Sequence, residues 1–141
     1  MPLPPDVLRR LRAAALTVQR RARAPYSNFH VGAALLMQSG RIVAGCNVEN
    51  ASYGLTICAE RNAIGRAVAE AAGLPVACVV VGPTDRPLTP CGACRQVLNE
   101  FNPAMAIICI GKRGELLETT AGALLPASFG SDALDEAAGK S

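Results

Sequence analysis

Apolar residues recur at three- and four-residue intervals near the start of the chain, which predicts an amphipathic helix from Pro5 to Ala24. The opposite face of this helix is basic and carries Arg9, Arg10, Arg12, Arg20, Arg21 and Arg23. Aromatic residues do not alternate with these arginines, so we interpret the face as a solvated surface rather than as a nucleic-acid interface.

Two short apolar runs follow, at His30–Met37 and Arg41–Cys46, and the Gln38-Ser39-Gly40 segment between them predicts a β-hairpin. Helical and continuous apolar patterns then alternate along the chain. They predict, in order, a helix at Ile57–Ala72, a strand at Val76–Val81, a helix at Cys91–Phe101 and a strand at Ala104–Ile110. Thr89 is the candidate N-cap of the second of these helices, with Pro90 in its first turn.

The last part of the chain has weaker patterns. Residues 115–125 predict one short strand or helix, and residues 131–141 predict a frayed tail rich in Ala and Gly. The hairpin requires antiparallel pairing, whereas the later strand–helix–strand unit requires parallel neighbours with a right-handed crossover. We therefore expect a single α/β domain over residues 1–141, with a mixed sheet covered by helices on both faces.

The composition agrees with a folded domain. A chain of 141 residues has the usual size of one domain, and its 50% hydrophobic and 18% charged residues exclude an intrinsically disordered chain. The formal net charge of +3 is too small to indicate a nucleic-acid partner by itself. Aromatic residues make up only 4% and Trp is absent, so the apolar side chains are mostly small. Such a chain either packs them tightly or buries more of them between subunits.

The N-terminal residues do not have the pattern of a signal peptide, because three prolines and an acidic residue precede the first apolar stretch. No apolar run approaches the ~18 residues that are needed to span a bilayer. We therefore expect a cytoplasmic protein with no membrane partner. In that compartment, cysteine thiols bind metals or carry out chemistry rather than form disulfides.

The six cysteines form two groups. Three lie within or at the end of predicted strands, among Val, Ile and Ala: Cys46, Cys78 and Cys109. Free cysteine behaves there as a small hydrophobic residue, so we expect these three in the core. The other three lie in a turn or in the first turn of a predicted helix: Cys58, Cys91 and Cys94. The N-terminus of a helix lowers a thiol pKa, and thiolates are ligands that favour zinc.

The Cys91-Gly92-Ala93-Cys94 motif is by itself a weak signal, because redox pairs and structural zinc sites share it. A structural zinc site has four protein ligands, and His30, the only histidine, is expected to be packed or exposed in a strand. Three ligands with an open position are typical of a catalytic zinc that holds a water. A redox pair is the weaker interpretation, because it does not account for Cys58.

Two neighbours of Cys58 carry charges. Glu60 can be a solvated carboxylate in the first turn of a helix or, if a metal caps the helix end, a proton acceptor for a bound water. Arg61 can be a surface charge or a hydrogen-bond donor to the thiolates. Three thiolates and Zn²⁺ leave a net negative charge, which acidifies water poorly unless such bonds offset it.

Together these residues resemble the zinc signature of cytidine deaminases in their small homotetrameric form. The matching segments are Cys58-Ala59-Glu60-Arg61, Pro90-Cys91-Gly92-Ala93-Cys94-Arg95-Gln96, Pro25-Tyr26-Ser27-Asn28-Phe29 with Val31-Gly32-Ala33-Ala34-Leu35, residues 45–53, and Leu124-Leu125-Pro126 with Phe129. The resemblance covers nearly the whole chain in one order. It implies a three-layer α-β-α fold whose central mixed sheet has about five strands.

The resemblance also implies roles for single residues. Cys58, Cys91 and Cys94 would hold one Zn²⁺ per subunit, with Glu60 as the proton shuttle and Arg61 as a donor behind the ligands. The nucleoside would be bound by four further residues: Phe29 would stack on the base, the Ala59 N–H would contact the base carbonyl, and Asn47 and Glu49 would bind the ribose 3′-hydroxyl. A neighbouring subunit would contribute Ala51, Ser52, Tyr53 and Phe129.

The implied reaction is zinc-dependent hydrolytic deamination of free cytidine and 2′-deoxycytidine to the uridines and ammonia, in pyrimidine salvage. The implied assembly is a homotetramer with shared active sites, and no nucleic-acid partner is expected. Two alternatives stay open at this point. Deamination of cytosine within a nucleic acid would need a long basic groove with stacking aromatics, and the chain has two Tyr and three Phe. A non-catalytic zinc-stapled module would hold the metal without turnover.

Overall fold

The computed structural model describes residues 3–140 and contains one five-stranded mixed sheet. The strands are β1 (Gly32–Met37), β2 (Ile42–Cys46), β3 (Pro75–Val81), β4 (Ala106–Ile110) and β5 (Leu116–Thr120), in the spatial order β2-β1-β3-β4-β5. β1 pairs antiparallel with β2 and β3, β3 pairs parallel with β4, and β5 returns antiparallel along β4. The predicted hairpin and the predicted parallel pair are therefore both confirmed.

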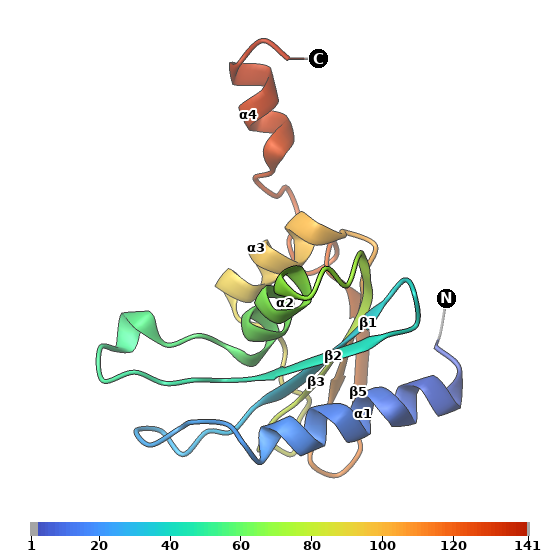
Figure 1. The fold of residues 1–141 in the computed structure, drawn as a ribbon, viewed down its shortest axis with the longest axis vertical. Coiled ribbons are helices and arrows are strands. Elements are labelled where there is room, and N and C mark those ends of the chain that lie inside the picture. The colour runs from blue at the N-terminus through green and yellow to red at the C-terminus, as the bar shows by residue number, and fades with distance from the viewer. Residues whose placement is uncertain (1–2, 141) are drawn as a thin grey trace.

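Helices cover both faces of the sheet, as Figure 1 shows, so the predicted three-layer α/β fold is confirmed. α1 (Pro5–Gln19) lies on one face, where Leu11 and Ala15 pack with Ala34 and Val79 of the strands. α2 (Ala59–Ala69) and α3 (Gly92–Phe101) lie on the other face and form a second apolar cluster with the alternate strand residues. The alternation of side chains along each strand divides the core into these two layers.

Three predicted boundaries are wrong. α1 ends at Gln19 instead of Ala24, because the backbone of Arg23 leaves the helix to bond with the backbone of Asn47 and Glu49. α3 has Cys91 as its N-cap and begins at Gly92, so Thr89 is not the cap. The expected frayed tail contains a helix, α4 (Ser131–Ala137), with no buried residue.

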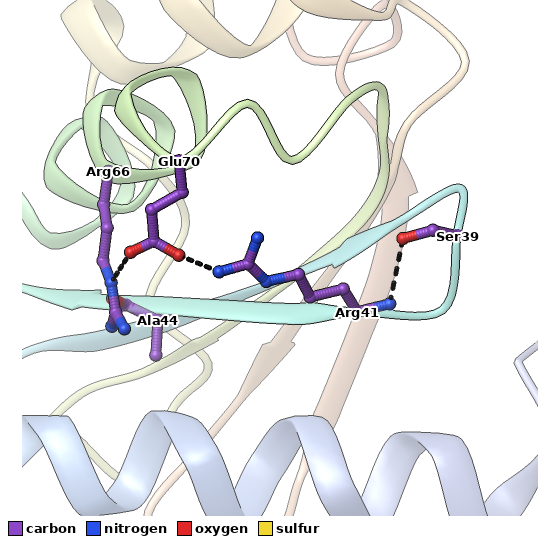
Figure 2. Close-up of polar contacts among 5 residues, drawn as sticks. All are labelled: Ser39, Arg41, Ala44, Arg66 and Glu70. Carbon is purple, nitrogen blue, oxygen red and sulfur yellow. Dashed lines mark hydrogen bonds and ion pairs between the residues drawn. The ribbon is translucent and has the colours of Figure 1, made fainter.

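An ionic contact ties the C-terminal end of α2 to β2 (Figure 2). The Glu70 carboxylate accepts hydrogen bonds from Arg66, one turn before it, and from Arg41, which precedes β2. Arg66 also donates to the carbonyl of Ala44 within β2, at 3.1 Å. Arg66, and to a smaller degree Arg41, hold the pKa of Glu70 below its ordinary value.

Two glycines in the hairpin let helices approach the sheet closely on its opposite faces. A Cβ on Gly32 would lie 2.0 Å from the carbonyl oxygen of Ala15 in α1. A Cβ on Gly45 would lie 2.5 Å from the backbone nitrogen of Ala63 in α2. Any larger residue at these positions would push a helix away from the sheet, and at Gly45 the displaced helix is the one that follows Cys58.

The Gly45→Ala substitution is therefore expected to destabilise the protein by about 1–3 kcal/mol, the usual cost of overpacking a closely packed contact. Gly65→Ala is the matched control. Gly65 lies in α2, the helix that Gly45 contacts, and a Cβ on Gly65 would meet open space. Alanine there should stabilise the protein by about 0.8–1 kcal/mol through helix propensity. Urea unfolding measures both changes, and equal stability of the two variants would contradict this account of α2 packing.

Candidate metal centre and active site

Three thiols meet where the N-termini of α2 and α3 come together. Cys58 is the N-cap of α2, Cys91 is the N-cap of α3, and Cys94 lies in the first turn of α3. Their Sγ atoms all lie within 4.8 Å of one another, and the Sγ atoms of Cys58 and Cys91 are 3.7 Å apart. The structure thus brings together the three cysteines that the sequence assigned to a metal.

The charges around these thiols favour thiolate. Both helices direct unpaired N–H groups and the positive end of their dipole at the cluster. A hydrogen bond from the Cys94 thiol, together with one from Arg61 Nη2 at 3.5 Å, lowers the pKa of Cys58 to about 5. The same contact with Cys58, and burial, raise the pKa of Cys94. The contact between Cys58 and Cys94 thus favours the thiolate of Cys58, and a metal ion that displaces the proton between them would bind both sulfurs.

The donor set fits zinc. Three sulfurs within 4.8 Å are soft ligands of the kind that Zn²⁺ takes, and none of the three is tied up in a disulfide. Arg61 already donates to one of these sulfurs, which is the role behind the ligands that the sequence indicated for it. Its Nε is also the one buried side-chain nitrogen or oxygen within residues 3–140 that lacks a hydrogen-bond partner.

Glu60 lies beside the thiols and faces a cavity. Its side chain belongs to the first turn of α2 and only 4% of the residue is exposed. Burial raises the pKa of the Glu60 carboxyl above its ordinary value, and the charge of Cys58 adds to this. A carboxyl group with a raised pKa beside a water-accessible cavity is suited to both accepting and donating a proton.

The cavity beside Glu60 has a volume of ≈ 210 Å³. Six of the predicted site residues line it: Phe29, Asn47, Cys58, Ala59, Glu60 and Cys91. Ala59 is the first residue of α2, so its N–H has no partner within the helix. The cavity therefore joins two of the three predicted metal ligands to three of the four predicted nucleoside contacts, although they are distant in sequence.

Asn47 holds the segment that carries Phe29. Its Oδ1 accepts a hydrogen bond from the Val31 N–H at 2.9 Å, and its Nδ2 donates to the Phe29 carbonyl at 2.8 Å. One N–H of the amide group is left for a ligand. Asn47 thus has a positional role in addition to the binding role predicted for it.

Glu49 does not line this cavity. Its carboxylate accepts hydrogen bonds from the Ser27 hydroxyl and from the N–H groups of Tyr26 and Ser27, which hold the pKa of Glu49 below its ordinary value. The Ser27 hydroxyl oxygen in turn accepts from the Phe29 N–H at 3.0 Å. Glu49 lines an adjoining cavity of ≈ 340 Å³ instead, which shares Thr56 with the first.

The residues expected to serve a neighbouring subunit lie outside the cavity of their own chain. Ala51 and Ser52 are exposed, and so are the rings of Tyr53 and Phe129, whose residues are 76% and 62% exposed. Tyr53 lies in the loop that extends from the body of the molecule in Figure 1, with its ring centroid 6.0 Å from that of Tyr26. Large aromatic rings with this exposure are unusual in an isolated domain.

Sequence analysis missed four residues that shape the site: Ser27, Thr56, Leu88 and Thr89. Ser27 links Glu49 to the Phe29 backbone, and the other three line the ≈ 210 Å³ cavity. Thr89 precedes the Pro90-Cys91 pair, so its proximity to a predicted ligand was a usable signal. The sequence contains no such signal for Leu88 and Thr56, because only the packing of loops brings them to the cavity.

The remaining cysteines are separate from the metal centre. Cys78 and Cys109 are fully buried in β3 and β4, as predicted for core residues, and burial raises their pKa values, that of Cys109 to about 12. Thiols with such pKa values are poor nucleophiles and ligands. Cys46 at the end of β2 is only partly buried.

Among the helices that the structure describes, none combines the length and the apolar character that crossing a membrane requires.

Comparison with known proteins identifies relatives along most of the chain. The family model of the cytidine and deoxycytidylate deaminase zinc-binding region matches residues 6–110. A cytidine deaminase of Halalkalibacterium halodurans is 46% identical over 123 residues, which cover 86% of this chain and 93% of the relative. A cytidine deaminase of Sporosarcina psychrophila is 44% identical over 130 residues, covering 92% and 96%. The crystal structure of cytidine deaminase from Burkholderia pseudomallei has a TM-score of 0.81 at 48% identity, covering 86% of this chain and 98% of that one.

Replacing any one of the three clustered cysteines by serine is expected to lower the zinc affinity by at least the 10–100-fold that loss of a supporting residue causes at other metal sites. Cys46→Ser is the matched control, because Cys46 is a partly buried thiol outside the cluster. Metal analysis of the purified variants measures the effect. Full zinc content in Cys91→Ser together with depletion in Cys46→Ser would contradict the assignment.

Proposed function

The chain belongs to the family of zinc-binding cytidine and deoxycytidylate deaminases, and we propose that it catalyses the hydrolysis of cytidine to uridine and ammonia. The single observation that carries this function is the joining of three clustered thiols, a buried carboxyl group and a cavity at the N-termini of α2 and α3. A bound Zn²⁺ supplies the chemistry of a water with a lowered pKa. Cys58, Cys91 and Cys94 would hold it, one ion per subunit.

Glu60 is the proton carrier in this proposal. Its carboxylate takes one proton from the water that attacks C4 and delivers it to ring nitrogen N3. It then takes the second proton from the new hydroxyl group on C4 and passes it to the amino group, which leaves as ammonia while the C4 carbonyl forms. Support for this role comes from its place on the cavity wall beside the ligands and from burial, which favours the protonated form that the later steps need. Because Glu60 is held in the first turn of α2, its distance from the ligand Cys58 is set by the helix.

The substrate contacts are also proposals. Phe29 supplies a face for the base, the Ala59 N–H binds the base carbonyl, and the free N–H of Asn47 binds the ribose 3′-hydroxyl. Glu49 also binds the ribose, and for this its carboxylate turns away from Ser27. Support comes from Thr56, which lines both the Glu49 cavity and the Glu60 cavity. Cytidine and 2′-deoxycytidine are both accepted, since no assigned contact depends on the 2′ position.

The assembly we propose is a homotetramer with shared active sites. Ala51, Ser52, Tyr53 and Phe129 of the partner subunit complete each site. Support comes from their exposure in the single chain. The enzyme acts in pyrimidine salvage in the cytoplasm, a compartment suited to a protein whose six cysteines are all unpaired.

The Glu60→Gln variant is expected to keep its zinc but to lose turnover by about 10²–10⁴-fold, because glutamine preserves the shape of the side chain and cannot carry the proton. Glu100→Gln on the exposed side of α3 is the control and should leave turnover unchanged. Ultraviolet absorbance follows cytidine consumption, and metal analysis follows the zinc. Wild-type turnover in Glu60→Gln would exclude this role.

If the active sites are shared between subunits, two inactive variants should restore activity when they are co-expressed. Glu60→Gln and Phe129→Ala should each have low activity alone. Co-expressed subunits should recover part of the wild-type turnover, because an intact Glu60 of one chain can meet an intact Phe129 of its neighbour. Phe101→Ala, at an exposed ring on α3, is the control for the loss of an aromatic side chain. Co-expression without recovery would show that each chain uses its own Phe129 or none.

A further inference from the structure

The helix α4 has an apolar side that nothing in its own chain covers. Its apolar residues Ala133, Leu134 and Ala137 lie on one side at three- and four-residue spacing, and Leu134 is 60% exposed. Its acidic residues Asp132, Asp135 and Glu136 lie on the other side. An isolated helix shorter than ~12–15 residues is marginal in water, and α4 has 7. An amphipathic helix this short needs a partner surface.

The opposite part of the molecule has a surface of matching character. α1 packs on β1, β2 and β3, and an open groove remains between α1 and the ends of β4 and β5. This α1 groove consists of two cavities of ≈ 270 Å³ each that share Arg12 and Ile110. Its apolar wall is formed by Leu8, Leu16, Ile110 and Leu116, and its charged groups are Arg9, Arg12 and Lys112.

The charges of the two surfaces are complementary. No Asp or Glu is among the described residues that line the α1 groove, whereas every charged residue within α4 is acidic. The nearby Asp85 is paired with Arg113 at 3.5 Å and does not offset the groove's basic groups. An acidic amphipathic helix therefore matches the groove in both its apolar and its charged parts.

We infer that α4 of a second copy of this chain docks in the α1 groove. Leu134 and Ala137 of α4 then meet the apolar wall, and the acidic side faces Arg9, Arg12 and Lys112. The partner is a second copy because α4 of the same chain extends from the end of the molecule opposite to α1 (Figure 1). Docking covers the exposed side of the helix and adds the missing helical layer beside β4 and β5.

This inference rests on the proposed function in one respect: it takes the partner of α4 to be another copy of the chain, as in the proposed homotetramer. The groove and the active-site cavity both lie near the C-terminal end of β3. Gly82 lines the groove, and a Cβ on Gly82 would lie 2.8 Å from Cδ2 of Leu88, which lines the cavity. Only Gly130 separates Phe129 from α4. One C-terminal segment of a partner thus reaches the region of the site with its ring and the groove with its helix.

A charge exchange tests this docking. The α4 variant is D132K/D135K/E136K, the groove variant is R9E/R12E/K112E, and the exchanged variant combines all of these substitutions. The first two should each weaken self-association about tenfold, and the exchanged variant should recover it because its charges are again opposite. The control R10E/R20E/R21E has the same net charge as the groove variant but lies outside the groove, and it should associate like the wild type.

Sedimentation equilibrium measures association, and circular dichroism checks folding of these exposed-site variants. A wild type that sediments as a monomer, a control as weak as the groove variant, or an exchanged variant without recovery would each overturn the inference. So would salt-sensitive binding of a single-stranded oligonucleotide that the groove variant loses while its association is unchanged, since the groove would then serve nucleic acid. Failure of the mixing experiment with a successful charge exchange would reject the shared site alone, and the reverse result would reject α4 docking alone.

Discussion

The close approach of α2 to β2 at Gly45 is the contact on which the site depends. Without a side chain at Gly45, the first half of α2 lies against the strand, and its N-cap, Cys58, comes to the end of α3. The Glu70 ion pairs tie the other end of α2 to β2 (Figure 2). A helix held at both ends can present three consecutive residues, Cys58, Ala59 and Glu60, in fixed positions. The three roles proposed for these residues would then come from one helical turn.

The same arrangement accounts for the electrostatics of the site. The Cys94 thiol, Arg61 and the helix N-terminus favour negative charge on Cys58, which prepares it for a cation. Burial acts in the opposite direction on Glu60 and favours its protonated form. Cys58 and Glu60, which lie within one turn of α2, are thus favoured in different protonation states: Cys58 as the thiolate and Glu60 as the neutral acid. A deaminase needs this difference, because its ligands must stay deprotonated while its proton carrier must release and accept protons.

Large apolar groups outside the site are exposed in the single chain. Tyr53 and Phe129 leave large rings in solvent, and α4 leaves an amphipathic helix without a partner. All five aromatic residues are exposed in the single chain, and Tyr53 and Phe129 are the two most exposed of them. Aliphatic side chains and methionines fill the two core layers, and the aromatic rings lie outside them. The proposed homotetramer would bury these exposed groups.

The sequence by itself determined the order of elements and the three cysteines that cluster at the candidate metal centre. These features depend on local spacing: periodicity for Leu11 and Ala15, strand patterns around Cys78 and Cys109, and helix starts at Cys58 and Cys91. The tertiary structure alone decided the end of α1, the cap of α3, the helix in the tail and the walls formed by Thr56 and Leu88. The physical reason is that these depend on contacts between segments far apart in the chain. Pairing of Arg23 with residues 47–49 ends a helix that its own sequence would extend.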